Sequence, residues 1–273
     1  MRGVKKMDII LDKKDLTYLK WSHIRNSSGT AGTFLKSQSA LGGRKIYYKL
    51  SNYEKDSGIV GHENINEIIV DRLLTVLGVE HLHYQLIYAD IEIDGRTHTA
   101  YVCASEDFKD RGESKVALDA LYKADRMAGE TEYDFCKRLG FDEYIDRMLA
   151  VDYIILNRDR HGANIEVLRN ARKHSLRIAP LFDHGLSLMF SCRTDEEIKN
   201  FDIMGDIKCN NFIGSRSNAE NLKLISGKNL FKNRLQASDR EFIFNGLETV
   251  ISKVHQDRIW EMITERYRRY ENL

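Results

Sequence analysis

The hydrophobic pattern of this 273-residue chain changes its period near residue 104, and this change limits the possible folds more than any other feature. Before residue 104 most apolar segments are short and β-prone, whereas after it apolar residues recur three and four positions apart. The chain has one proline, no internal repeat and no linker-like stretch. The pattern predicts an α+β fold with a β-rich amino-terminal lobe, residues 1–104, and a helical carboxy-terminal lobe, residues 105–273.

The amino-terminal lobe is expected to contain hairpins and one helix. Two β-prone runs, 33–37 and 45–50, flank a glycine-containing turn at 41–44, and Asp94-Gly95 is a second hairpin signal. Helical spacing of apolar residues predicts a helix over 64–77. Further strands are expected at 84–89, 91–93 and 97–103.

The carboxy-terminal lobe is expected to be mainly helical. Apolar spacing predicts helices over 116–126, 131–139 and 141–156, and a late helix that contains Ile243, Leu247, Val250 and Val254. Two short strand-like runs, 165–168 and 176–179, follow the third of these helices.

Charge and cysteine content exclude several functional classes. The chain has 42 basic and 41 acidic side chains and a formal net charge of +1, which gives no basis for binding nucleic acid by itself or a membrane. The basic run at 266–270 is expected to offset the dipole of a helix end. The four cysteines form no C-x-x-C pair, and no stretch of about 18 apolar residues occurs. We therefore expect a cytoplasmic protein with reduced thiols.

Three polar residues lie where phosphoryl transfer would need them. Asp159 and Asn164 are five residues apart in a break after the helix expected at 141–156, and Asp183 follows a short strand. Phosphoryl transfer needs a positioned hydroxyl and metal ions on the phosphates. An Asp can accept the hydroxyl proton, and an Asn–Asp pair can hold Mg²⁺. Each motif alone is common by chance, and Asp183 could simply cap a turn, but their joint appearance in this order predicts a phosphotransferase.

Four residues of the amino-terminal lobe extend this prediction. Lys49 ends an expected strand and Glu67 lies on the following helix, so the two could pair beside nucleotide phosphates. Alternatively, they are a solvated edge lysine and a helix-surface carboxylate. The turn that contains Gly29 and Gly32 would allow backbone N–H groups to approach phosphate oxygens, although it is not a Walker A sequence.

Two segments carry a resemblance to a known family. Asn157-Arg158-Asp159-Arg160-His161-x-x-Asn164 and Ile178-Ala179-Pro180-Leu181-Phe182-Asp183-x-Gly185 resemble the HipA-type serine/threonine kinases of bacteria. The chain is most similar to short forms that lack the HipA amino-terminal extension. Asp159-Arg160-His161 also resembles the catalytic loop of the phosphatidylinositol 3- and 4-kinases. The resemblance covers roughly residues 27–190 and implies a two-lobed protein-kinase-like fold with ATP and Mg²⁺ as cofactors.

The resemblance also implies residue roles. Asp159 would be the catalytic Asp, Asn164 and Asp183 the metal ligands, Lys49 the phosphate contact and Glu67 its partner. His161 would lie beside the transferred phosphoryl group, or it would hold the loop by hydrogen bonds. Residues 103–108 would form the hinge that meets adenine. Candidate autophosphorylation sites are Ser27, Ser28 and Ser37.

The sequence departs from the family pattern in two places. Asp183-His184-Gly185 replaces Asp-Phe-Gly, so the phenylalanine-based switch of eukaryotic kinases is not assumed, and the glycine turn matches no kinase consensus closely. The implied partners are a protein substrate with a Ser/Thr acceptor and an antitoxin or regulatory protein. The alternatives are a lipid or small-molecule kinase and a nucleotide-binding pseudokinase.

Overall fold

The computed structural model describes residues 8–24 and 31–273, which form two compact units. The first unit contains the chain up to Asp71 together with Leu82–Asp107, and the second contains Arg72–His81 and Phe108–Leu273. These units differ from the expected lobes mainly in Arg72–His81, which belongs to the second unit. The boundary lies inside helix α1 (Glu63–Leu77), so one continuous helix contributes to both units.

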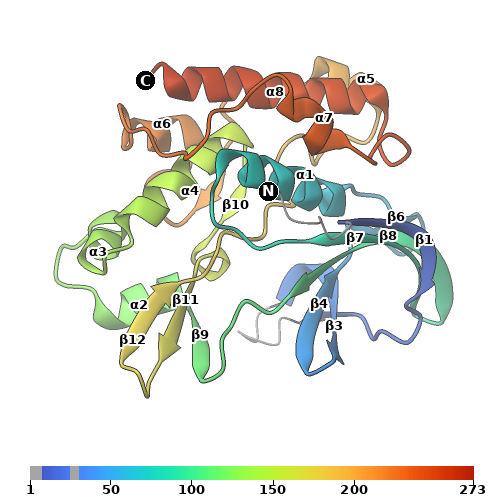
Figure 1. Ribbon diagram of the computed structural model, residues 1–273, viewed down its shortest axis with the longest axis horizontal. Helices are drawn as coiled ribbons and strands as arrows, with labels where there is room; N and C mark the ends of the chain where they lie inside the picture. Colours follow the sequence, from blue (N-terminus) through green and yellow to red (C-terminus); the bar gives the residue numbers. More distant parts are fainter. Residues whose placement is uncertain (1–7, 25–30) are drawn as a thin grey trace. The chain divides into compact units, whose positions relative to one another are not determined.

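A six-stranded sheet forms the first unit, in the order β1-β7-β8-β4-β3-β2 (Figure 1). Strand β1 pairs with β7 in parallel, and the other neighbours are antiparallel. Its strands are β1 (Ile9–Asp15), β2 (Ser22–Ile24), β3 (Ala31–Leu41), β4 (Arg44–Lys49), β7 (Gln85–Ile93) and β8 (Arg96–Glu106). A separate small pair is formed by β5 (Tyr53–Glu54) and β6 (Gly58–Ile59).

Both expected hairpins are confirmed. The β7–β8 turn contains Asp94 and Gly95 at φ 52° and 75°, and two positive φ angles are what a tight two-residue hairpin turn requires. The segments expected at 84–89 and 91–93 are one continuous strand, β7. Strand β1 was not expected, because its sequence after Ile10 is almost entirely exposed and charged.

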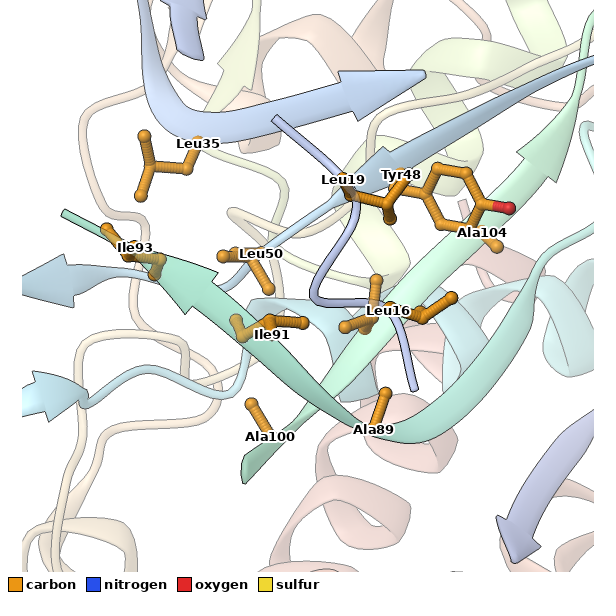
Figure 2. Close-up of a cluster of buried hydrophobic side chains, with 11 residues drawn as sticks. Leu16, Leu19, Leu35, Tyr48, Leu50, Ala89, Ile91, Ile93, Ala100 and Ala104 are labelled. Carbon is orange, nitrogen blue, oxygen red and sulfur yellow. The ribbon is translucent and has the colours of Figure 1, made fainter. Parts of the chain in front are cut away.

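The core of the first unit lies against one face of this sheet. Figure 2 shows Leu16 and Leu19, from the turn after β1, among side chains such as Ile91 of β7 and Leu50, which directly follows β4. Leu50 and Ile91 are completely buried. Burying a side chain of this size contributes roughly 1.5–3 kcal/mol, so apolar contacts help to hold the turn after β1, together with the hydrogen bond from Leu16 N to the Asp90 carbonyl at 2.8 Å.

The second unit combines helices with a three-stranded antiparallel sheet, β12-β11-β9 (Figure 1). These strands are β9 (Glu113–Ala117), β11 (Glu166–Asn170) and β12 (Ser175–Ile178). The helices are α2 (Leu118–Asp125), α3 (Glu132–Arg138), α4 (Asp142–Ile154), α5 (Asp195–Asn200), α6 (Asn218–Lys223), α7 (Asp239–Phe244) and α8 (Lys253–Glu271). Two further short strands, β10 (Asp159–Arg160) and β13 (Asn210–Asn211), pair in parallel.

Two expectations for the second unit were wrong. The helix expected from residue 116 begins at Leu118, because Val116 pairs with Val167 in strands β9 and β11. The single late helix is instead two helices. Gly246 at φ 77° ends the first, and the Ser252 hydroxyl caps the second by accepting a hydrogen bond from His255 N at 3.1 Å.

The basic run at the end of α8 has two roles. Arg268 and Arg269 lie in the last turn, as expected for cations that offset the helix dipole. Arg266 is completely buried and donates to the backbone carbonyls of Ile203 and Tyr153 at 2.7 and 2.9 Å. Within residues 8–24 and 31–273, no helix is both long and apolar enough to cross a membrane.

Candidate active site

The loop that carries Asp159 begins directly after the end of α4. Leu156, at φ 53°, ends the helical path, and Asn157 then binds back to Asp152 of α4. The Asn157 backbone N–H donates to the Asp152 carbonyl at 2.9 Å, and its side-chain amide donates to the Asp152 carboxylate at 2.8 Å. Because the Asn157 side-chain oxygen also accepts from the Asp159 N–H at 3.1 Å, the direction of the loop is fixed before Asp159 is reached.

Asp159 and Asn164 lie together, as the sequence predicts. Residues Gly162–Asn164 form a single 3₁₀ turn, and the Asn164 amide nitrogen donates to the Asp159 carbonyl at 2.9 Å. This bond commits the nitrogen of the Asn164 amide to the loop, which leaves the amide oxygen as its possible metal ligand. The Asp159 side chain is about a quarter exposed, 26%, so its carboxylate is accessible to an acceptor.

His161 has a defined tautomer when it is neutral. Its Nδ1 atom accepts a hydrogen bond from Ala163 N at 3.2 Å, so the proton must lie on Nε2. Nε2 lies 3.7 Å from Oδ2 of Asp159, which is too long for a hydrogen bond but close enough for an electrostatic contact. The structure thus supports the loop-holding role of His161, and its contact with a phosphoryl group remains a prediction.

Arg160 connects this loop to the segment that precedes Asp183. Its guanidinium is buried and forms a 2.9 Å ion pair with Asp152. Burial alone would lower the pKa of Arg160, but the attraction and hydrogen bonds of Asp152 outweigh it, so the pKa is raised and the charge is retained. Its Nη1 atom donates to the carbonyl of Phe182 at 2.7 Å and to that of Asn164 at 3.4 Å. A single buried cation therefore contacts the backbone beside both predicted metal ligands.

Asp183 has a left-handed backbone conformation with φ 61°. Non-glycine residues adopt this conformation infrequently, and when they do they cluster at functional sites. The preceding residue, Phe182, is held by the bond from Arg160 and by a ring contact with Phe108 at 5.6 Å. The Asp183 side chain is half-buried, and its position along the chain is defined by these neighbouring contacts.

In the first unit, Lys49 and Glu67 form the expected pair. Lys49 Nζ lies 2.9 Å from the Glu67 carboxylate, and the exposed fractions of the two side chains are 13% and 0%. Asn64, one helical turn before Glu67, donates to the carbonyls of Lys49 and Tyr101 at 3.0 and 2.9 Å. These bonds fasten the start of α1 to β4 and β8, so Glu67 faces Lys49. The alternative of a solvated edge lysine and a surface carboxylate is wrong.

The glycine turn is only partly described. Gly29 lies outside the described residues, as do Ser27 and Ser28, while Gly32 lies in strand β3. Ser37, the third candidate for autophosphorylation, is buried within β3. The roles of Gly29 and Gly32 in phosphate binding remain predictions.

The sequence matches no protein-family model and no curated protein. The structure is similar to the crystal structure of a Helicobacter pylori proinflammatory kinase, CtkA, with a TM-score of 0.63 and 16% identity over 95% of this chain and 98% of the other. This chain has a kinase-like fold. The expected two-lobed, kinase-like fold class is confirmed, and so is the resemblance to bacterial kinases at the level of the fold.

A more distant structure is Shewanella oneidensis MR-1 HipA, solved as a toxin–antitoxin complex with HipB and operator DNA. Its TM-score is 0.44, with 14% identity over 92% of this chain and 66% of the HipA chain. This similarity is too low to support an argument about this chain.

Two residues of the loop network were missed at the sequence level. Asp152 is the one charged position in the last seven residues of α4, Met148–Ile154, and it is completely buried and binds both Asn157 and Arg160. A carboxylate within so apolar a stretch is itself a signal, because buried charges are normally paired. Asn210 had no such signal, since it binds Asp159 from 51 residues away.

Proposed function

We propose that this chain is an ATP- and Mg²⁺-dependent protein kinase that phosphorylates a Ser or Thr hydroxyl. The observation that supports the proposal most is the Arg160 contact. One buried guanidinium binds the backbone of the Asn164 loop and the carbonyl before Asp183, within a kinase-like fold. A general polar network would not require both predicted metal ligands to be held in this way.

The donor set suits magnesium. Asn164 supplies an amide oxygen and Asp183 a carboxylate, and Mg²⁺ prefers few protein oxygens together with substrate phosphates. Bound magnesium would neutralise charge on the ATP phosphates. The rigid backbone on either side of each ligand would reduce the cost of ordering it.

Asp159 is proposed as the proton acceptor. The acceptor hydroxyl would give its proton to the Asp159 carboxylate while its oxygen bonds to the γ-phosphorus of ATP. The bond between that phosphorus and the β–γ bridging oxygen would break, and the electron pair would leave with ADP. Lys49, held by Glu67, is proposed to contact the ATP phosphates, and His161 to keep the loop in place.

The test is transfer of labelled phosphate from ATP by purified protein in the presence of Mg²⁺. Asp159→Ala and Asp183→Ala are each expected to reduce transfer by about 100-fold or more. The exposed variant Glu220→Ala, on α6, is the matched control and should retain full activity. Unchanged transfer in both active-site variants would overturn the assignment.

The same experiment separates the alternatives. Phosphoserine or phosphothreonine in the product supports a protein kinase, whereas label only on a lipid or a small molecule supports a kinase of another acceptor. ATP binding in a thermal-shift assay without any transfer supports a pseudokinase. An antitoxin or regulatory partner stays a prediction, to be tested by co-purification.

A further inference from the structure

Asn210 contacts the carboxylate of Asp159 directly. Its side-chain amide nitrogen donates to Oδ1 of Asp159 at 3.1 Å. Asn210 is exposed and belongs to β13, in the segment that follows Asp183 along the chain. The proposed phosphoryl transfer gives Asn210 no role.

The backbone determines where this side chain lies. Asn210 pairs with Asp159 in the parallel register of β13 and β10, so the two side chains leave the same face of the ladder. The Asn210 N–H donates to the Arg158 carbonyl at 2.8 Å, and the Phe212 N–H donates to the Arg160 carbonyl at 2.9 Å. The contact with Asp159 therefore follows from strand pairing rather than from a freely rotating surface residue.

A second anchor holds the same segment to the loop. The Asn218 amide nitrogen donates to the carbonyl of Asn157 at 2.7 Å, and both side chains are buried. The Cys209 thiol in turn donates to the side-chain oxygen of Asn218 at 3.4 Å. The segment that carries Asn210 is thus held to the Asp159 loop both by strand pairing and by Asn218.

The two carboxylate oxygens of Asp159 have different surroundings. Oδ1 accepts the hydrogen bond from Asn210, whereas Oδ2 faces His161 Nε2 at the longer distance of 3.7 Å. A hydrogen bond to one oxygen restricts rotation of the carboxylate about its Cβ–Cγ bond. Oδ2 is therefore the oxygen better suited to accept the acceptor's proton.

We propose that Asn210 is a positioning residue that holds Oδ1 of Asp159 and directs Oδ2 toward the acceptor hydroxyl. This inference rests on the proposed kinase function. In this proposal Asn210 acts through Asp159, so its loss should change the rate of transfer and not the binding of nucleotide.

The test compares steady-state kinetics of three variants with the wild type. Asn210→Ala removes the donor and should lower kcat by about 10-fold, with the KM for ATP unchanged, since a hydrogen bond to a charged group is lost. Asn210→Gln keeps an amide donor and should recover part of kcat. Lys208→Ala, a neighbouring exposed position, is the control and should behave as the wild type. The thermal midpoint should be the same in all four proteins.

A double variant checks that the effect passes through Asp159. In an Asp159→Ala background, Asn210→Ala should cause no further loss. A wild-type kcat in Asn210→Ala, while Asp159→Ala is inactive, would overturn this inference and leave the proposed function intact. A reduced thermal midpoint or a raised KM for ATP in Asn210→Ala would identify a structural role instead. If the wild-type protein transfers no phosphate, both the proposed kinase function and the positioning role of Asn210 are wrong.

Discussion

In the first unit a single ion pair, Lys49–Glu67, joins a strand to a helix, whereas in the second unit hydrogen bonds join the polar groups of four separate segments. The first arrangement depends on the sheet and on Asn64, which fix both partners from outside the pair. The second depends on the polar groups themselves, because Asp152, Arg160 and Asn157 each make several of the contacts. We therefore expect loss of one residue to affect the second unit more than the first.

The largest effect is expected at Asp152. Asp152→Ala would leave the buried Arg160 guanidinium without its carboxylate, which should lower the free energy of unfolding by roughly 3–5 kcal/mol. Urea denaturation followed by circular dichroism measures this change. The exposed pair Lys223–Glu220 provides the control, and Glu220→Ala should cost no more than about 0.5 kcal/mol. Equal losses of unfolding free energy in Asp152→Ala and Glu220→Ala would contradict the prediction that the buried Asp152–Arg160 pair matters more than an exposed pair.

The second effect concerns pH, and its sign should differ between the units. Burial lowers the pKa of His255, in the second unit, from 6.5 to about 4. Between these two pH values the unfolded chain binds a proton at His255 that the folded chain does not bind. The contribution of neutral, buried His255 to stability is therefore fully present above pH 6.5 and is lost as the pH falls toward 4. The loss should approach about 3 kcal/mol at the low end, and His255→Gln should abolish it.

His83, in the first unit, gives the opposite sign. The hydrogen bond that protonated His83 donates to the Asp71 carboxylate raises the pKa of His83. The contribution of His83 to stability is therefore present below its unfolded pKa and is lost as the pH rises through its folded pKa. Unfolding curves of His255→Gln and His83→Gln across pH 4–8 measure how each histidine contributes to the free energy of unfolding. The contrast fails if the two variants change the pH profile in the same direction.

The third effect tests how closely the loop packs. Gly162 lies against the start of α2, and an added Cβ would overlap the Asp119 side chain and lie 3.0 Å from the Asp119 backbone nitrogen. Backbone cannot move aside as a flexible side chain can, so Gly162→Ala should cost roughly 1–3 kcal/mol and displace Asn164. Reduced transfer together with a lower thermal midpoint is expected. Gly129→Ala serves for comparison, because it adds a Cβ in open space, although its positive φ adds some strain.

The fourth effect concerns Glu67 in the first unit, whose pairing with Lys49 corresponds to the Asp152–Arg160 pair of the second unit. Glu67→Gln keeps the shape and removes the charge that faces Lys49, which is still partly exposed to solvent. The loss of stability should be about 1–2 kcal/mol, smaller than at Asp152, because water can replace part of the lost interaction. The KM for ATP should rise. A stability loss equal to that of Asp152→Ala would show that the two units do not differ as described.

The last prediction concerns the reactivity of a thiol and not the free energy of unfolding. Burial raises the pKa of Cys209 to about 11, so very little thiolate is present at pH 8 and the thiol should react slowly with an alkylating reagent. Asn218→Ala removes the bond that holds Cys209 beside the Asp159 loop and should accelerate the reaction. Mass spectrometry of labelled peptides measures the rate, and Cys136, which is also buried, is the internal reference.

Local signals predicted much of this fold. The Asp94-Gly95 turn, the helix after residue 63 and the helix before Asn157 each follow from short-range patterns, and all three are confirmed. The grouping of Asp159 with Asn164 and the pairing of Lys49 with Glu67 were also predicted. These relations depend on residues close in sequence or on regular elements.

The features that could not be predicted depend on distant partners. Strand β1 is an exposed edge strand whose pairing with β7 leaves no apolar pattern, and β13 has only two residues. Asp152 and Arg160 differ from ordinary surface charges only through burial, which the sequence does not state. The prediction of one late helix was wrong because helical apolar spacing continues across Asn245 and Gly246, where the backbone leaves the helical region.

The pairing of β10 with β13 also has a consequence for the order of synthesis. Asn210 leaves the ribosome 51 residues after Asp159, and Asn218 leaves it 61 residues after Asn157. Until those residues emerge, the nascent chain carries Asp159 on a loop that lacks these two supports. Competence for transfer should therefore arise late in translation, when most of the second unit is already outside the exit tunnel.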